Sequence, residues 1–171
     1  MRLRRCFIGI GANLPARGFK TPLDTCCAAI ETLTECGFEV TATSRWYESA
    51  PVPLSDQPWF INGVAECGVR KDASSTLTTL HQIESKFGRV RGEVNAPRVL
   101  DLDLLDFDGK ISTGPAITLP HPRMHERAFV LLPMRDLAPT WAHPVLGLTI
   151  GDLIDFLTPE QEIRLYNIRD N

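Results

Sequence analysis

The chain has 171 residues, of which 43% are hydrophobic and 23% are charged, and its formal net charge is −3. This length is sufficient for one compact core and short for two, so we expect a single domain over residues 1–171. The weak negative charge predicts no general attraction to nucleic acid or to an anionic membrane, and any anion site must therefore be local.

The cysteines give a further exclusion. There are five, scattered and without a Cys-x-x-Cys motif, which predicts neither a disulfide framework nor a zinc site. They are typical of small core residues in a reducing compartment, and we expect a cytoplasmic protein. The apolar run at residues 6–10 is too short for a signal sequence, and no segment has the length of a membrane span.

The first part of the chain predicts a strand, a helix and two further strands. A short strand covers residues 5–10. Thr21 caps a helix that ends at Gly37, because the sequence Thr-Pro-Leu-Asp is typical of a helix start and glycine of a helix end. Residues 38–48 and 60–69 have the β-branched and aromatic content of strands.

A second helix and a fourth strand follow. Residues 73–87 carry apolar residues at helical spacing, which predicts a helix. A strand is expected to begin near Asp101. The order strand, helix, strand, strand, helix, strand predicts an α+β fold of the ferredoxin-like type, an antiparallel sheet with helices on one face. Beyond this core, residues 128–137 and 150–157 are expected to add helices.

Two carboxylates lie two residues apart in the fourth strand. Because strand side chains alternate, Asp101 and Asp103 share one face, while Leu100, Leu102 and Leu104 fill the other. Paired oxygen donors near an arginine are suited to Mg²⁺ and a phosphate chain. The alternative is a strand end with two solvated acids.

Positive charge is concentrated just before this pair. Residues 86–98 contain four basic residues and one acid, namely Lys86, Arg89, Arg91 and Arg98 against Glu93. Guanidinium groups beside a metal pair can neutralise a polyphosphate, because arginine makes bidentate contacts with phosphate oxygens. A solvated, arginine-rich surface loop is the alternative.

Several short segments between about residues 6 and 139 form a recognisable series. They are Gly11-Ala12-Asn13-Leu14, Tyr47-Glu48-Ser49-Ala50-Pro51, Gln57-Pro58-Trp59-Phe60-Ile61-Asn62, Ile83-Glu84, Gly88-Arg89-Val90-Arg91, Pro97-Arg98-Val99-Leu100-Asp101-Leu102-Asp103, Leu119-Pro120-His121-Pro122 and Arg127-Ala128-Phe129. In their order and spacing these segments resemble one enzyme family, the 6-hydroxymethyl-7,8-dihydropterin pyrophosphokinases of folate synthesis. The resemblance implies a transferase that converts ATP and the pterin alcohol into the pterin pyrophosphate and AMP.

The resemblance also implies catalytic roles for the acids and arginines. Asp101 and Asp103 would bind two Mg²⁺ ions that bridge the phosphates of ATP. Arg89 and Arg98 would meet the charge that develops during transfer, and Arg91 would contact ATP more peripherally.

Further residues would bind the nucleotide. Glu84 would accept hydrogen bonds from the ribose hydroxyls with His81 beside it, and His121 and Arg127 would hold phosphate oxygens from the other wall.

The pterin ring needs a flat slot with polar partners at its edge. By the resemblance, Phe60 and Phe129 would stack on the two faces, and Asn62 would meet the ring edge with an amide that we expect to be unpaired in the free protein. Backbone groups at Ser49, Ala50 and Val52 would complete the frame. The alternative for both phenylalanines is an ordinary place in the core.

The loops at residues 49–58 and 88–96 flank the expected site and are candidate lids. In the second, Asn95 stands near the place where many family members have tryptophan.

Two other functions remain open for this fold. An RNA-binding domain would need an exposed aromatic and basic sheet, whereas the strand here carries two acids. A regulatory ligand-binding domain would not need a carboxylate pair backed by arginines.

Overall fold

The computed structural model describes residues 2–90, 92 and 97–167. The core consists of β1 (Arg4–Ala12), α1 (Pro22–Glu35), β2 (Glu39–Thr43), β3 (Tyr47–Ser49), β4 (Phe60–Val69), α2 (Ala73–Lys86) and β5 (Asp101–Phe107). The additions are β6 (Ser112–Thr113), β7 (Thr118–Leu119), a 3-10 turn (Met124–Glu126), α3 (Ala128–Leu137), α4 (Ile150–Asp155) and β8 (Ile163–Leu165). The predicted α+β, ferredoxin-like order is confirmed.

The main sheet has six strands in the order β5-β1-β4-β3-β8, and β2 also pairs with β4. Every pairing between its strands is antiparallel. β1 lies between β4 and β5, and its residues 6–11 have a partner on both sides. The main sheet therefore joins the end of β1 directly to the two acids of β5.

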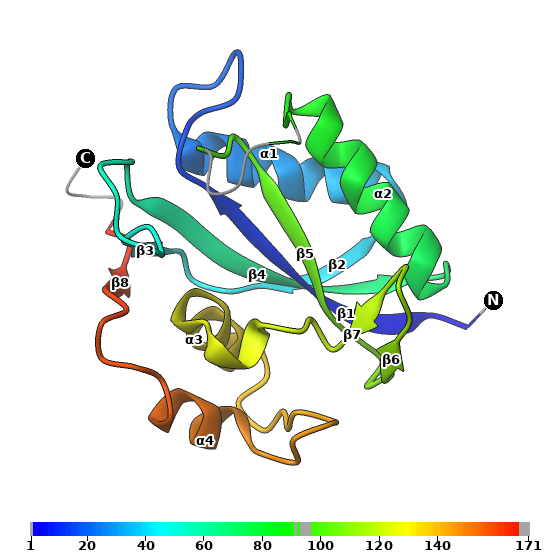
Figure 1. Ribbon diagram of the computed structural model, residues 1–171. Coiled ribbons are helices and arrows are strands. Elements are labelled where there is room, and N and C mark those ends of the chain that lie inside the picture. Colours follow the sequence, from blue (N-terminus) through cyan, green and yellow to red (C-terminus); the bar gives the residue numbers. More distant parts are fainter. Residues whose placement is uncertain (1, 91, 93–96, 168–171) are drawn as a thin grey trace.

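Helices α1 and α2 cover one face of the sheet (Figure 1). β1 contributes Cys6, Ile8 and Ile10 to this core, and they pack with buried residues of both helices. The predicted cap of α1 is present, since Thr21 Oγ1 accepts from the Asp24 N–H at 3.1 Å. Both helices end at glycines with positive φ, as expected from the sequence.

The other face is covered at one end by α3 and α4 (Figure 1). The residues of β1, β4 and β5 that point this way include Phe7, Val64 and Leu105, which pack against both added helices. The sequence predicted α3 and α4 as helices but not their place on this second face. Because α3 and α4 cover only part of this second face, they determine where on it the candidate site can open.

The predicted strand over residues 38–48 is wrong in one respect, because it forms two strands. β2 ends opposite Ala65 and β3 begins opposite Asn62, so residues 44–46 face only two residues of β4. The extra residue is accommodated by a bend in which Ser44 Oγ accepts from the Val64 N–H at 2.9 Å.

Candidate active site

A row of three residues crosses the sheet on the face that α3 leaves open. Gly11 of β1 pairs with Asn62 of β4 on one side and with Asp101 of β5 on the other. Two residues before Gly11 in β1, Gly9 pairs with Asp103. A β-carbon at Gly11 would lie 3.0 Å from Asn62 Oδ1, so the missing side chain leaves the floor open between amide and acid.

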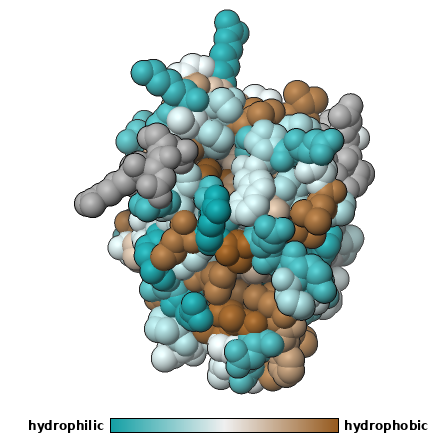
Figure 2. All heavy atoms as spheres, turned by 90° about the vertical axis from the view of Figure 1, so that its left-hand side faces the viewer, coloured by the Kyte–Doolittle hydropathy of each residue, from teal (hydrophilic) through white to brown (hydrophobic). Residues whose placement is uncertain are grey.

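This floor belongs to a cavity of about 1170 Å³. The face that carries it is turned toward the viewer in Figure 2, where apolar side chains gather in the lower half. Both acids, four arginines and the residues expected to form the pterin slot line the cavity. Apolar residues of the C-terminal part also line it, namely Leu146, Leu148, Leu153, Phe156 and Leu157. Most of the described residues that the sequence selected therefore share one opening, whereas His81 and Glu84 do not line it.

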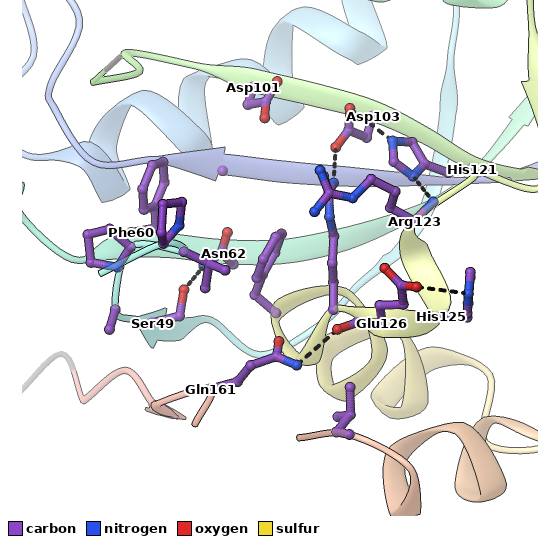
Figure 3. Close-up of a pocket in the computed structure, with 18 of the residues that line it drawn as sticks. Ser49, Phe60, Asn62, Asp101, Asp103, His121, Arg123, His125, Glu126 and Gln161 are labelled. Carbon is purple, nitrogen blue, oxygen red and sulfur yellow. Dashed lines mark hydrogen bonds and ion pairs between the residues drawn. The ribbon is translucent and has the colours of Figure 1, made fainter. Parts of the chain in front are cut away.

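The two acids are held differently. Asp101 Oδ1 accepts from Arg89 Nη1 and Asp101 Oδ2 from Arg98 Nη1, each at 2.7 Å. Among the described residues, the charged partners of Asp103 are more distant, with Arg127 Nη1 at 3.7 Å and His121 Nε2 at 3.9 Å (Figure 3). Burial and the neighbouring Asp101 carboxylate raise the pKa of Asp103 above its usual range. Within the described part of the chain, no cationic nitrogen therefore lies as close to Asp103 as the two arginines lie to Asp101.

His121 and Arg127 form the opposite wall. His121 Nδ1 accepts from the Arg123 N–H at 3.2 Å, which leaves the Nε2 side toward Asp103. Burial, together with the positive charge of Arg127, lowers the pKa of His121 to about 4, so the ring is neutral at neutral pH. Arg123 also lines the cavity, and sequence reasoning did not select it.

Glu84 of α2 is buried behind the acids. Its Oε1 accepts from the Leu102 N–H at 2.8 Å and also contacts Arg89 Nη1. The helix thus fixes both the strand that carries the acids and the arginine that pairs with Asp101. Such long-range roles are not visible in the local helical spacing.

A second, smaller cavity of about 300 Å³ lies on the other side of these groups. His81, Glu84 and the segment 115–118 line it, and it shares Arg89, Asp103 and His121 with the large cavity. His81 lines only this smaller cavity. The two cavities therefore lie next to each other at Asp103.

The expected ring slot lies at the other end of the large cavity. Phe60 and Phe129 are half-buried and line it, as do Ser49, Ala50 and Val52. Asn62 is not unpaired as expected, because its Nδ2 donates to Ser49 Oγ at 2.8 Å (Figure 3). Asn62 is 6% exposed, so the strand pair β3–β4 holds its amide in a fixed orientation.

Asn13 and Gln161 make contacts at the site that the sequence did not predict. Asn13 lay in one of the recognised segments without a role, and its side chain binds the backbone of Arg98. Gln161 lies in the C-terminal part and lines the cavity. Arg91 and Asn95 lie outside the residues that the structure describes.

The two acids of β5 are the candidate ligands for Mg²⁺. Within the described ranges, no group of three or more His, Cys, Asp or Glu side chains could hold a metal alone. Mg²⁺ commonly binds one or two carboxylates together with substrate phosphates, and Asp101 and Asp103 provide such a partial set. The pair therefore fits Mg²⁺ that arrives with a polyphosphate.

Comparison with protein families matches residues 7–139 to the family described as 7,8-dihydro-6-hydroxymethylpterin-pyrophosphokinase (HPPK). A 2-amino-4-hydroxy-6-hydroxymethyldihydropteridine pyrophosphokinase of Synechocystis sp. is 39% identical over 86% of this chain and 73% of its own length. The Methylorubrum extorquens protein of the same name is 33% identical over 92% of this chain and 96% of its own length.

Longer proteins also match. The Pneumocystis carinii folic acid synthesis protein fol1 is 38% identical over 87% of this chain, which spans 20% of that protein. Among solved structures, a Plasmodium falciparum HPPK-DHPS crystal structure has a TM-score of 0.69 at 14% identity, over 90% of this chain and 44% of that one. At that identity the likeness supports the fold. No helix in the described part of the chain could cross a membrane.

Asn62, Arg98, Asp101 and Asp103, which lie in segments that carried the resemblance, line the large cavity. The family model and the two bacterial relatives cover most of the chain. The chain belongs to the 7,8-dihydro-6-hydroxymethylpterin pyrophosphokinase family.

Proposed function

We propose that this chain transfers the pyrophosphoryl group of ATP to the hydroxymethyl group of 6-hydroxymethyl-7,8-dihydropterin, giving the pterin pyrophosphate and AMP. The observation that carries the proposal is the row Asn62, Gly11 and Asp101, which brings a ring-binding amide and a metal-binding acid to one cavity floor. The aromatic slot and the polyphosphate site must be neighbours, as they are here, because the pterin oxygen has to reach the β-phosphorus of ATP.

The acids would hold the metal. Asp101 and Asp103 are the ligands in our proposal, with two Mg²⁺ ions completed by phosphate oxygens. When bound, Mg²⁺ neutralises the phosphate chain and makes the phosphorus more electrophilic. The longer distances from Asp103 to its described charged partners, 3.7 Å and 3.9 Å, support its assignment as a ligand.

Arginines would supply the remaining positive charge. Arg89 and Arg98 pair with Asp101 in the structure, and they lie in the cavity where the phosphates must pass. We infer that they bind the transferred group and the departing AMP, while Arg127 and neutral His121 hold phosphate oxygens from the opposite wall. Arg91 is assigned to ATP by the resemblance alone.

The smaller cavity would take the nucleoside. It opens onto Asp103 and contains Glu84 and His81, the residues proposed to meet the ribose. The pterin would lie in the large cavity between Phe60 and Phe129, with Asn62 at its edge and the backbone of Ser49, Ala50 and Val52 around it. In this arrangement ATP approaches from one side of the acids and the pterin from the other.

Other expectations stay proposals. We propose that residues 1–171 act as a single domain in the cytoplasm, without a nucleic-acid or membrane partner. The carboxylates at the cavity floor support the preference for an enzyme over an RNA-binding or regulatory domain.

The test is product analysis. The purified chain is incubated with ATP, Mg²⁺ and the pterin alcohol, and the nucleotides are separated by chromatography. We expect AMP in equal amount to the pterin pyrophosphate, and none when either pterin or Mg²⁺ is omitted. ADP as the nucleotide product would contradict the proposal, because it would show transfer of one phosphoryl group.

A further inference from the structure

The side-chain amide of Gln161 spans the backbone around Arg127. Its Oε1 accepts from the Ala128 N–H and its Nε2 donates to the Glu126 carbonyl, each at 2.9 Å (Figure 3). These two partners are the residues immediately before and after Arg127. Gln161 lies beyond residues 7–139, the part that matches the family model.

The Gln161 side chain satisfies a backbone N–H at the start of helix α3. It begins at Ala128, and its N-cap residue Arg127 makes no side-chain hydrogen bond to the helix. The first N–H groups of a helix have no partner inside it and are usually satisfied by the side chain of the cap. Here Gln161 supplies the acceptor from 33 residues further along the chain.

The residues on either side of Ala128 face the candidate site. Arg127 lies 3.7 Å from Asp103, and Phe129 lines the ring slot. The guanidinium of Arg127 also lies over the Phe129 ring, 5.5 Å from its centroid. A shift of the backbone at residues 126–128 would therefore move a phosphate-binding group and a pterin-binding group together.

The chain after Gln161 is fixed to the opposite wall of the slot. β8 pairs with β3, placing Ile163 opposite Ser49. The Ala50 N–H donates to the Glu162 carbonyl at 3.0 Å. The C-terminal segment thus holds the Ser49 wall by its backbone, and through Gln161 it holds the Phe129 wall.

We propose that Gln161 is a positioning residue for the transfer reaction, which sets Arg127 and Phe129 relative to the Ser49 wall. This inference rests on the proposed function. The contact requires one acceptor and one donor in the same planar group, which a glutamine provides. Methionine has a similar length but neither hydrogen bond, and an ionised glutamate keeps the acceptor but loses the donor.

The experiment compares Gln161→Met and Gln161→Glu with the wild-type chain. Glu160→Met is the matched control, because Glu160 is the exposed neighbour. Pterin affinity is measured by calorimetry with a non-hydrolysable ATP analogue and Mg²⁺, and AMP formation gives kcat and KM. Thermal melting shows that each variant is folded at the assay temperature.

We expect Gln161→Met to raise the Kd and the KM for pterin by about tenfold, with a smaller change in kcat. Gln161→Glu should show a similar loss, although it keeps the cap of α3 and therefore folds even where Gln161→Met does not. Glu160→Met should match the wild type.

A Kd for pterin within about twofold of wild type in Gln161→Glu would overturn the inference, whatever the change in melting temperature. A purely structural role would lower the melting temperature and leave both KM and Kd unchanged. Absence of AMP formation by the wild-type chain would instead overturn the proposed function, so the two failures are distinguishable.

Discussion

Asn13 accepts a hydrogen bond from the backbone N–H of Arg98, with its Oδ1 and that nitrogen 2.8 Å apart. The Arg98 carbonyl in turn accepts from the Asn13 N–H at 3.0 Å. The Asn13 Nδ2 donates to Gln57 Oε1 at 3.0 Å and to the Pro58 carbonyl at 3.2 Å. One asparagine, 1% exposed, therefore connects the segment of Arg98 to the loop that follows β3.

Replacing Asn13 should impair catalysis through Arg98. We expect Asn13→Ala to lower kcat/KM by about 10- to 100-fold, because a small displacement of a charge-stabilising group has a large effect on rate. It should also reduce the free energy of unfolding by about 1–3 kcal/mol, since buried polar groups lose their partners. Steady-state AMP formation and urea unfolding measure the two effects.

Gln57→Ala is the matched control. It removes one partner of the Asn13 Nδ2 and leaves the bond from Asn13 to Arg98 in place. We expect its kcat/KM to stay within about threefold of wild type. An Asn13→Ala variant as active as Gln57→Ala would show that Arg98 is held by other contacts.

The two acids should differ in their effect on stability. Asp101→Asn and Asp103→Asn are both expected to lower AMP formation by at least about 10²-fold, as loss of a preorganised charge does. Asp101→Asn should also lower the melting temperature without ATP, because it weakens two contacts of 2.7 Å to arginines.

Asp103→Asn should melt no lower than wild type, because the Arg127 guanidinium, its closest one among the described residues, is 3.7 Å away. Asp108→Asn, the same change at an exposed position just after β5, is the control and should leave activity unchanged. If Asp103→Asn kept wild-type turnover at saturating Mg²⁺, it would not be a ligand.

Much of this fold could be predicted because its signals are local. Alternation in β5 placed Asp101 and Asp103 on one face, and the structure confirms that Leu100, Leu102 and Leu104 are buried. The bounds of β4 and α3 agree with the sequence, and the capping residues marked the start of α1. The comparisons confirm the family that the short segments indicated.

The remaining features depend on contacts between distant residues. Asn13 meets Arg98 across 85 positions, and Gln161 meets Ala128 across 33. Neither pair has a periodicity that a local pattern could reveal. One signal was available, since Gly9 and Gly11 alternate in β1 and would lie on the same face as the acids once the strands pair.

An ion pair remote from the floor of the site should make stability depend on pH. Asp136 of α3 accepts from Arg45 Nη2 at 2.7 Å and from the Tyr47 hydroxyl at 3.1 Å. Burial disfavours the charged form, but these hydrogen bonds outweigh it and hold the pKa of Asp136 below its usual range. Because the folded pKa is depressed, the stabilisation is fully present above the unfolded pKa and is lost as pH falls through the folded one.

We therefore expect Asp136→Ala to reduce the free energy of unfolding by about 1–3 kcal/mol at pH 7. The difference from wild type should stay constant down to about pH 5 and shrink below about pH 4. Urea unfolding across this pH range measures it, and Arg135→Ala, at an exposed neighbouring position, is the control. A difference that did not change with pH would show that the charge of Asp136 contributes nothing.

Two variants can distinguish the proposed role of the Asn62 amide in pterin binding from its hydrogen bond to Ser49. Both Asn62→Ala and Ser49→Ala remove the 2.8 Å contact, so each should cost about 1 kcal/mol of stability. Only Asn62→Ala also removes the group proposed to meet the ring edge, and we expect it to weaken pterin binding at least about tenfold more than Ser49→Ala does. Calorimetry with an ATP analogue and Mg²⁺ measures both affinities. Equal losses would mean that the amide serves to hold the strand pair and that the pterin edge binds elsewhere.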